Sequence, residues 1–273
     1  MKYTLQAIRY SLRNILYLLP LAVVPALFLS GSVDSVALET VIHAFFEGEI
    51  HSWTFPDLFR ALSILNFASL KSIGFGVLGV VALIVSVSMM MAFLEKHMRY
   101  GKRSFNGIVS KINDNLLPTL GFGALILVIY EIWTLIFASI LYLCSRFSFV
   151  FVAYAMVAVL FVVLHFVLLY TISMLYLWLP CMQITGFRAA EALQYSNQLS
   201  SPLKWHIILS QTASVFIMEA LLIVTVHFSN SLLVFTIIST LLFALMLIVF
   251  CVRMEIVYFA SDNIERRDLR KYY

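Results

Sequence analysis

Six long runs of apolar residues constrain the fold of this chain more than any other feature of its sequence. The runs lie near residues 15–30, 72–94, 118–143, 148–180, 205–228 and 231–252. At a rise of about 1.5 Å per residue, a helix of about 20 residues crosses roughly 30 Å of hydrocarbon. Hydrophobic residues make up 62% of the 273 positions and charged residues 12%, so one water-soluble core could not bury the apolar surface. The sequence therefore predicts an all-α polytopic bundle of about six transmembrane helices, in one domain over residues 1–273.

The basic residues are divided very unevenly between the two ends of these spans. Fifteen of the 18 Lys and Arg residues precede the first span, follow the last one or lie in the second and fourth connections; the others are Arg60, Lys71 and Arg146. Lys and Arg accumulate in the cytoplasmic loops of membrane proteins. We therefore expect both chain ends in the cytoplasm and the protein in the cell membrane, taken to be a bacterial plasma membrane. A cleaved signal peptide over the first 30 residues is the less favoured interpretation, because its loss would leave five spans.

Amphipathic segments precede three of the spans. Within residues 2–13, Leu5, Ile8 and Leu12 share one helical stripe, a pattern typical of a helix in the headgroup layer of a membrane. A similar segment precedes the third span and another precedes the fifth. Five basic residues of the first two segments are candidate contacts with lipid headgroups: Arg9, Arg13, Lys102, Arg103 and Lys111. The bilayer itself is thus the expected partner.

The same arrangement suggests a threefold internal repeat. Residues 7–11 read AIRYS and residues 192–196 read ALQYS, and Pro20, Pro118 and Pro202 each lie near the entry to a span. We divide the chain into units 1–99, 100–185 and 186–273, each an interfacial helix followed by an outward and an inward span. The alternative is that any interfacial helix has this composition.

A family resemblance rests on the segment around the start of the third unit. Its residues are Leu179-Pro180, Gly186, Glu191-Ala192-Leu193, Ser196, Leu199 and Lys204-Trp205, followed by a span. This segment resembles the multi-span membrane domain found ahead of some bacterial glycerophosphodiester phosphodiesterases and in related stand-alone bacterial membrane proteins of unknown function. The resemblance implies six spans with cytoplasmic amphipathic connectors. It does not imply the esterase activity, because these 273 residues contain no soluble phosphodiesterase domain.

Three ionisable residues fall well inside predicted spans. Glu131 and Glu219 are expected near mid-membrane in the third and fifth spans, and His165 in the fourth. A carboxylate in hydrocarbon must be protonated, paired or hydrated, so these residues are candidates for a ligand site or proton pathway. Histidine exchanges a proton near neutral pH. The alternative is a structural role, in which each side chain hydrogen-bonds a neighbouring helix.

The predicted outer segment, residues 31–71, is acidic and allows two interpretations. His43, Glu47, Glu49 and His51 include residue types that bind zinc. Their spacing matches no metal motif, so we favour a solvated acidic loop. After Pro56, an apolar-rich helix is expected to rest on the outer leaflet.

No catalytic motif is recognisable in the sequence. Walker A, HExxH, GxSxG, GxGxxG and paired CxxC patterns are missing, and Cys144, Cys181 and Cys251 are isolated. We expect no enzyme activity, no cofactor, no resident metal and no nucleic-acid partner. The favoured function is an accessory or scaffolding protein that organises lipid or a membrane or cytoplasmic partner subunit. The alternative is a small secondary transporter or lipid-moving protein that uses Glu131, Glu219 and His165.

Overall fold

Helices are the only regular secondary structure in the part of the chain that the structure describes. The computed structural model describes residues 2–66, 69–106, 108–228 and 231–269, apart from the side chains at 108–111 and 113. The helices are α1 Lys2–Arg13, α2 Ile15–Ser32, α3 Ser35–Phe46, η1 Ile50–Ser52, α4 Phe55–Leu62, α5 Leu70–Tyr100, α6 Ile108–Ser145, α7 Val150–Met174, α8 Trp178–Thr185, α9 Ala189–Ser200, η2 Ser201–Leu203, α10 Lys204–Phe228, α11 Leu232–Ser261 and η3 Arg267–Leu269. The predicted all-α fold class is confirmed.

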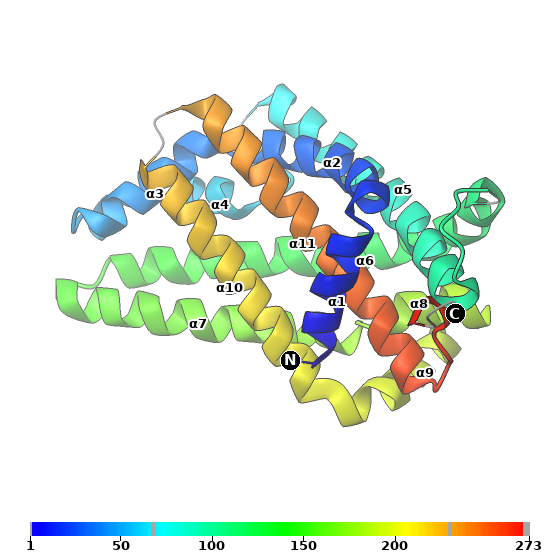
Figure 1. Cartoon of the computed structure of the whole chain (residues 1–273). Helices are drawn as coiled ribbons and strands as arrows, with labels where there is room; N and C mark the ends of the chain where they lie inside the picture. The colour runs from blue at the N-terminus through cyan, green and yellow to red at the C-terminus, as the bar shows by residue number, and fades with distance from the viewer. Residues whose placement is uncertain (1, 67–68, 107, 229–230, 270–273) are drawn as a thin grey trace.

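Six helical segments are long and apolar enough to cross a membrane, which confirms the predicted number of spans and makes this a multi-pass membrane protein. They close into a ring in chain order: α2 packs on α5, α5 on α6, α6 on α7, α7 on α10, α10 on α11 and α11 back on α2 (Figure 1). Each proposed repeat unit would contribute two adjacent members of this ring. The repeat itself stays a prediction.

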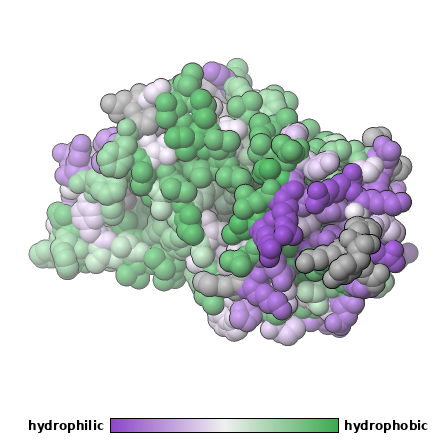
Figure 2. All heavy atoms as spheres, in the orientation of Figure 1, coloured by the Kyte–Doolittle hydropathy of each residue, from purple (hydrophilic) through white to green (hydrophobic). Residues whose placement is uncertain are grey.

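Hydrophilic residues gather at one end of the ring. Figure 2 shows them over the region of α1, the end of α5 and α9, whereas apolar residues cover most of the remaining visible surface. Helix α1 and the C-terminal end of α11 both lie on this side of the molecule (Figure 1). An even number of spans requires this arrangement.

The three predicted interfacial segments fold differently from one another. α1 and α9 are separate helices, divided from the following span by Asn14 and by η2. The middle segment instead continues into the third span as the single helix α6, which passes through Pro118 without a break. The three units are therefore not copies in detail.

The fourth span ends in a break that the sequence analysis did not foresee. We expected the long run at 148–180 to tilt or protrude, but α7 stops at Met174 and α8 begins at Trp178. Pro180 supplies a reason, because it has no N–H to donate to the carbonyl of Tyr176, four residues earlier. The buried Tyr176 side chain lies in this elbow, directed towards α11.

The outer segment is not a loop but a set of short helices that pack on the spans, and the position of its apolar helix on the outer leaflet stays a prediction. α3 packs on α10 and α4 on α6, and Ile50, Trp53 and Leu58 are buried in a core shared with α6 and α7. The correction has a physical cause. The acidic residues that suggested a solvated loop, such as Glu39 and Glu47, occupy the exposed side of a helix whose other side is apolar.

Arg146, directly after the end of α6, forms hydrogen bonds to this segment. Its guanidinium donates to the backbone carbonyls of His51 and Trp53, at 3.1 and 3.0 Å. Tyr154 on α7 donates to the carbonyl of Phe45 at 2.8 Å. We define residues 35–65 as the outer insert. Arg146 at the end of α6 and Tyr154 on α7 thereby hold it against these two helices.

We predict that Gly76→Ala destabilises the protein. A Cβ at Gly76 would lie 2.8 Å from the backbone oxygen of Ile64, so α5 and the outer insert would have to separate. Overpacking of this kind costs about 1–3 kcal/mol. The melting temperature in mild detergent measures the effect.

Gly74 provides the matched control on the same helix. A Cβ there would meet nothing within 4 Å, so Gly74→Ala should be neutral or slightly stabilising. Equal melting temperatures for the two alanine variants would contradict the close approach of α5 to Ile64.

Candidate functional site

A histidine and a glutamate from two spans form a direct pair within the helix ring. His165 on α7 and Glu219 on α10 approach to 2.8 Å between Nε2 and Oε1. The His165 side chain is 3% exposed and that of Glu219 is 26% exposed. The pair brings together two of the three intramembrane candidates from the sequence.

Hydrogen bonding fixes the tautomer of His165. Its Nδ1 lies 2.8 Å from the carbonyl oxygen of Phe161, which can only accept, so Nδ1 carries a hydrogen and donates it. The bond between Nε2 and Glu219 then contains one further proton. The pair is either a neutral imidazole with a protonated carboxyl or an imidazolium with a carboxylate, and both forms have zero net charge.

The pair is therefore a site that holds one exchangeable proton. Loss of that proton leaves a net negative charge, and gain of another leaves a net positive charge. Either change is costly in a low-dielectric surrounding unless a counter-charge or water compensates it. The second carboxyl oxygen, Oε2 of Glu219, is buried and has no hydrogen-bonding partner among the described residues.

Aromatic rings surround the imidazole. Trp133, Phe137, Phe161 and Phe216 place their ring centroids 4.8, 5.2, 4.3 and 5.7 Å from that of His165. The Trp133 indole N–H donates to the carbonyl of Leu164 at 2.8 Å. This environment restricts the orientation of the imidazole, whose hydrogen bonds go to the Phe161 carbonyl and to Glu219.

Glu219 projects away from the lipid-facing side of α10. Ile217, Leu221 and Val224 are 62%, 47% and 51% exposed and mark that side. Position 219 lies about 200° around the helix from position 217, at about 100° per residue. The carboxyl group consequently faces the bundle and not the acyl chains.

Glu131 has a different set of partners. Its Oε1 accepts from the backbone N–H groups of Ile64 and Leu65, both at 3.0 Å, and its Oε2 accepts from the Ser63 hydroxyl at 2.8 Å. The adjacent Tyr130 donates to the carbonyl of Leu62 at 2.7 Å. All these bonds reach the end of the outer insert, and none reaches His165 or Glu219. The structure thus gives Glu131 an anchoring contact.

The basic residues proposed to contact headgroups are exposed where the structure describes them. Arg9, Arg13, Lys102 and Arg103 are exposed, and the side chain of Lys111 lies outside the described residues. Leu5 and Leu12, on the apolar stripe of α1, are 74% and 67% exposed. An exposed leucine stripe beside arginines suits the boundary between headgroups and acyl chains.

A cluster of hydrogen-bonded side chains around His97 connects α1 to the end of α5. Arg103 Nε donates to His97 Nε2 at 3.4 Å, so Nδ1 carries the hydrogen and donates to the Tyr10 hydroxyl at 2.5 Å. Burial raises the pKa of Tyr10 above its usual range, so the phenol stays protonated. The Arg266 guanidinium lies 6.0 Å from the centre of the Tyr10 ring. The C-terminal tail therefore docks on the same cluster.

The candidate metal ligands of the outer insert do not converge. His51 Nδ1 contacts the carbonyl of Ser145 at 2.5 Å, and His43 lies 3.9 Å from both Glu39 and Glu47. Among the described residues, no group of three His, Cys, Asp or Glu side chains is placed to hold a metal ion. Cys144, Cys181 and Cys251 are buried free thiols.

Comparison with known proteins gives no further guidance: no protein-family model, curated protein or solved structure matches the chain. The resemblance to the membrane domain of glycerophosphodiester phosphodiesterases therefore stays a prediction. The function has to be argued from the site alone.

We predict that Glu131→Leu lowers the stability of the protein. The substitution introduces an apolar side chain of similar size, and it leaves two backbone N–H groups and the Ser63 hydroxyl without their acceptor. Hydrogen bonds to charged groups contribute about 1.5–3 kcal/mol each, so the melting temperature in detergent should fall by several degrees.

Glu39→Leu is the matched control, because Glu39 is a half-exposed glutamate on the same insert. It should melt close to the wild type. A Glu131→Leu variant with unchanged melting temperature would show that the carboxylate does not anchor the insert.

Proposed function

We propose that this multi-pass protein moves a small solute or a lipid across the membrane in a step coupled to protonation of the His165–Glu219 pair. The observation that carries the proposal is the 2.8 Å contact between these two side chains on neighbouring spans. A buried pair that holds one exchangeable proton can couple proton transfer to a change in how two helices pack.

The orientation of the protein follows from its charges. Fifteen of the 18 Lys and Arg residues lie before the first span, after the last span or in the second and fourth connections of the sequence, and α1, the end of α5 and α9 gather at one end of the ring (Figure 1). By the positive-inside rule, that end faces the cytoplasm of the cell in whose plasma membrane the protein resides. Protons driven inward would then reach the pair from the side of the outer insert.

Proteoliposomes test this function directly. The wild type is expected to carry protons inward under an imposed membrane potential, followed with a trapped pH-sensitive dye, or to flip fluorescent phospholipids, followed by chemical bleaching. Glu219→Gln removes the exchangeable proton but keeps a hydrogen-bonding side chain. It should reduce the proton-dependent rate at least tenfold, because no other described carboxyl contacts His165.

Glu131→Gln is the matched control, as it changes the other intramembrane glutamate in the same way. It should reduce stability while the rate per folded protein stays near that of the wild type. Wild-type liposomes that match empty ones in both assays would contradict transport.

A second function is supported by α1, and it is the accessory or scaffolding function that the sequence favours. Its exposed Leu5 and Leu12, with the exposed Arg9 and Arg13, form a surface suited to organising lipid or binding an amphipathic partner. Co-purification in mild detergent distinguishes this function. A bound partner that is lost in Leu5→Asn/Leu12→Asn, without loss of folding, would favour scaffolding over transport.

A further inference from the structure

Arg253 is a buried guanidinium whose hydrogen-bonding partners are all neutral. The residue is 3% exposed at the inner part of α11. Its Nε donates to the Tyr176 hydroxyl at 2.9 Å, and its Nη1 donates to Ser210 and Ser214 at 3.1 and 3.4 Å. Among the described residues, no carboxylate lies within ion-pair distance. A buried charge without a counter-charge is unfavourable, so an anion beside Arg253 would stabilise this region.

Glu255 does not take that position. It is the acidic residue of α11 closest to Arg253 in sequence, but two positions on a helix separate side chains by about 200°. Glu255 also interacts electrostatically with Tyr10 of α1. The space next to Arg253 is thus left to groups from α1 and α10.

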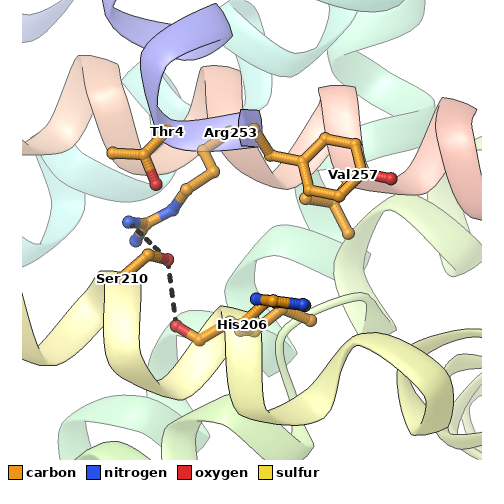
Figure 3. A pocket seen from close by; sticks show the side chains of 7 residues that line it. Thr4, His206, Ser210, Arg253 and Val257 are labelled. Atoms are coloured by element: carbon orange, nitrogen blue, oxygen red, sulfur yellow. Dashed lines mark hydrogen bonds between the residues drawn. The ribbon is translucent and has the colours of Figure 1, made fainter. Parts of the chain in front are cut away.

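A small cavity adjoins Arg253 and has polar groups on its wall. It has a volume of about 10 Å³ and is lined from α1 by Tyr3 and Thr4 and from α10 by His206 and Ser210. Figure 3 shows the Thr4 hydroxyl and Ser210 on either side of the guanidinium. The Thr4 hydroxyl oxygen is buried and has no hydrogen-bonding partner among the described residues. A second polar group is therefore available next to Arg253.

The cavity adjoins residues that are typical of the headgroup region. Trp205, beside His206 at the start of α10, is 65% exposed, as expected for an aromatic anchor at the membrane interface. Lys204 adds a positive charge one residue earlier, and its Nζ donates to the Tyr170 hydroxyl at 2.8 Å. The amphipathic α1 covers the other side. Anionic groups of the inner leaflet would reach this position.

We propose that the cavity between α1, α10 and α11 binds an anionic phosphate group. One phosphate oxygen enters the cavity, which has room for about one atom of that size, and accepts from Arg253 and Thr4. The rest of the group remains outside the cavity. The phosphate belongs to a lipid headgroup or to a free phosphate ion, and the site does not depend on the proton-coupled function.

Binding by the full-length protein in neutral detergent tests the site. Native mass spectrometry compares phosphatidylglycerol with phosphatidylcholine, and melting temperatures compare inorganic phosphate with chloride at equal ionic strength. We expect Arg253→Gln to weaken phosphatidylglycerol or phosphate binding at least tenfold, which is the loss of a hydrogen bond to a charged group. Thr4→Val keeps the shape of the side chain and should weaken binding about threefold to tenfold.

Arg267→Gln is the control, because Arg267 is an exposed arginine of the C-terminal tail that has no part in the proposed lipid contacts. It should change binding less than twofold. Preference for phosphatidylglycerol identifies a lipid headgroup, and stabilisation by inorganic phosphate identifies a free ion; both support the site. If Arg253→Gln fails to fold, Thr4→Val decides. Wild-type affinity in Thr4→Val, or a loss as large in Arg267→Gln, would overturn the proposal.

Discussion

The hydrocarbon core of a membrane offers no hydrogen bonds, and this constraint decides where the polar side chains of the protein lie. Each must find a partner within the protein, on its own helix or on a neighbouring one, since lipid cannot supply one. Ser30 on α2 contacts Ser239 on α11, and Ser173 on α7 donates to Gln211 on α10 at 3.0 Å. Apolar side chains gain little by leaving lipid for another helix, so these polar contacts and close packing specify which spans meet. Two of the six contacts between neighbouring spans, α2 with α11 and α7 with α10, include such a bond.

The spans and fold class could be predicted because they depend on local properties. Length and hydropathy of a run determine whether it crosses a membrane, whatever it packs against. The outer insert could not be predicted for the opposite reason. Its exposed glutamates signal water, and nothing local shows that Trp53 and Leu58 are buried against α6. Burial of that kind depends on which surface the segment meets after folding.

For the candidate site, too, the sequence predicted local properties but not contacts between distant residues. Sequence identified Glu131, Glu219 and His165 as unusual in hydrocarbon, but not which of them would pair. The contact between His165 and Glu219 depends on the relative rotation of α7 and α10, and the sequence pattern does not contain that rotation. Arg253 was missed because it stands at the end of an apolar run, where basic residues normally reach the headgroups. Its burial by Tyr176 and α1 depends on the break before α8.

Glu131 and Glu219 show that residue type and depth do not determine a role. Glu131 accepts from two backbone N–H groups, which are permanent donors and hold its carboxyl group in one position. Glu219 faces an imidazole, which can donate or accept according to its protonation. The first arrangement fixes structure, and the second allows a change of state.

Helix α6 connects these two arrangements. Glu131 and Tyr130 hold the end of the outer insert, and half a turn further on Trp133 lies against the His165 ring, with centroids 4.8 Å apart. Tyr130 interacts electrostatically with both glutamates. Any rotation of α6 that moves Trp133 away from His165 must also pull on the bonds to Ser63, Ile64 and Leu65, because the same helix carries both sets. The packing of the insert and the environment of the proton-holding pair are therefore mechanically linked through α6.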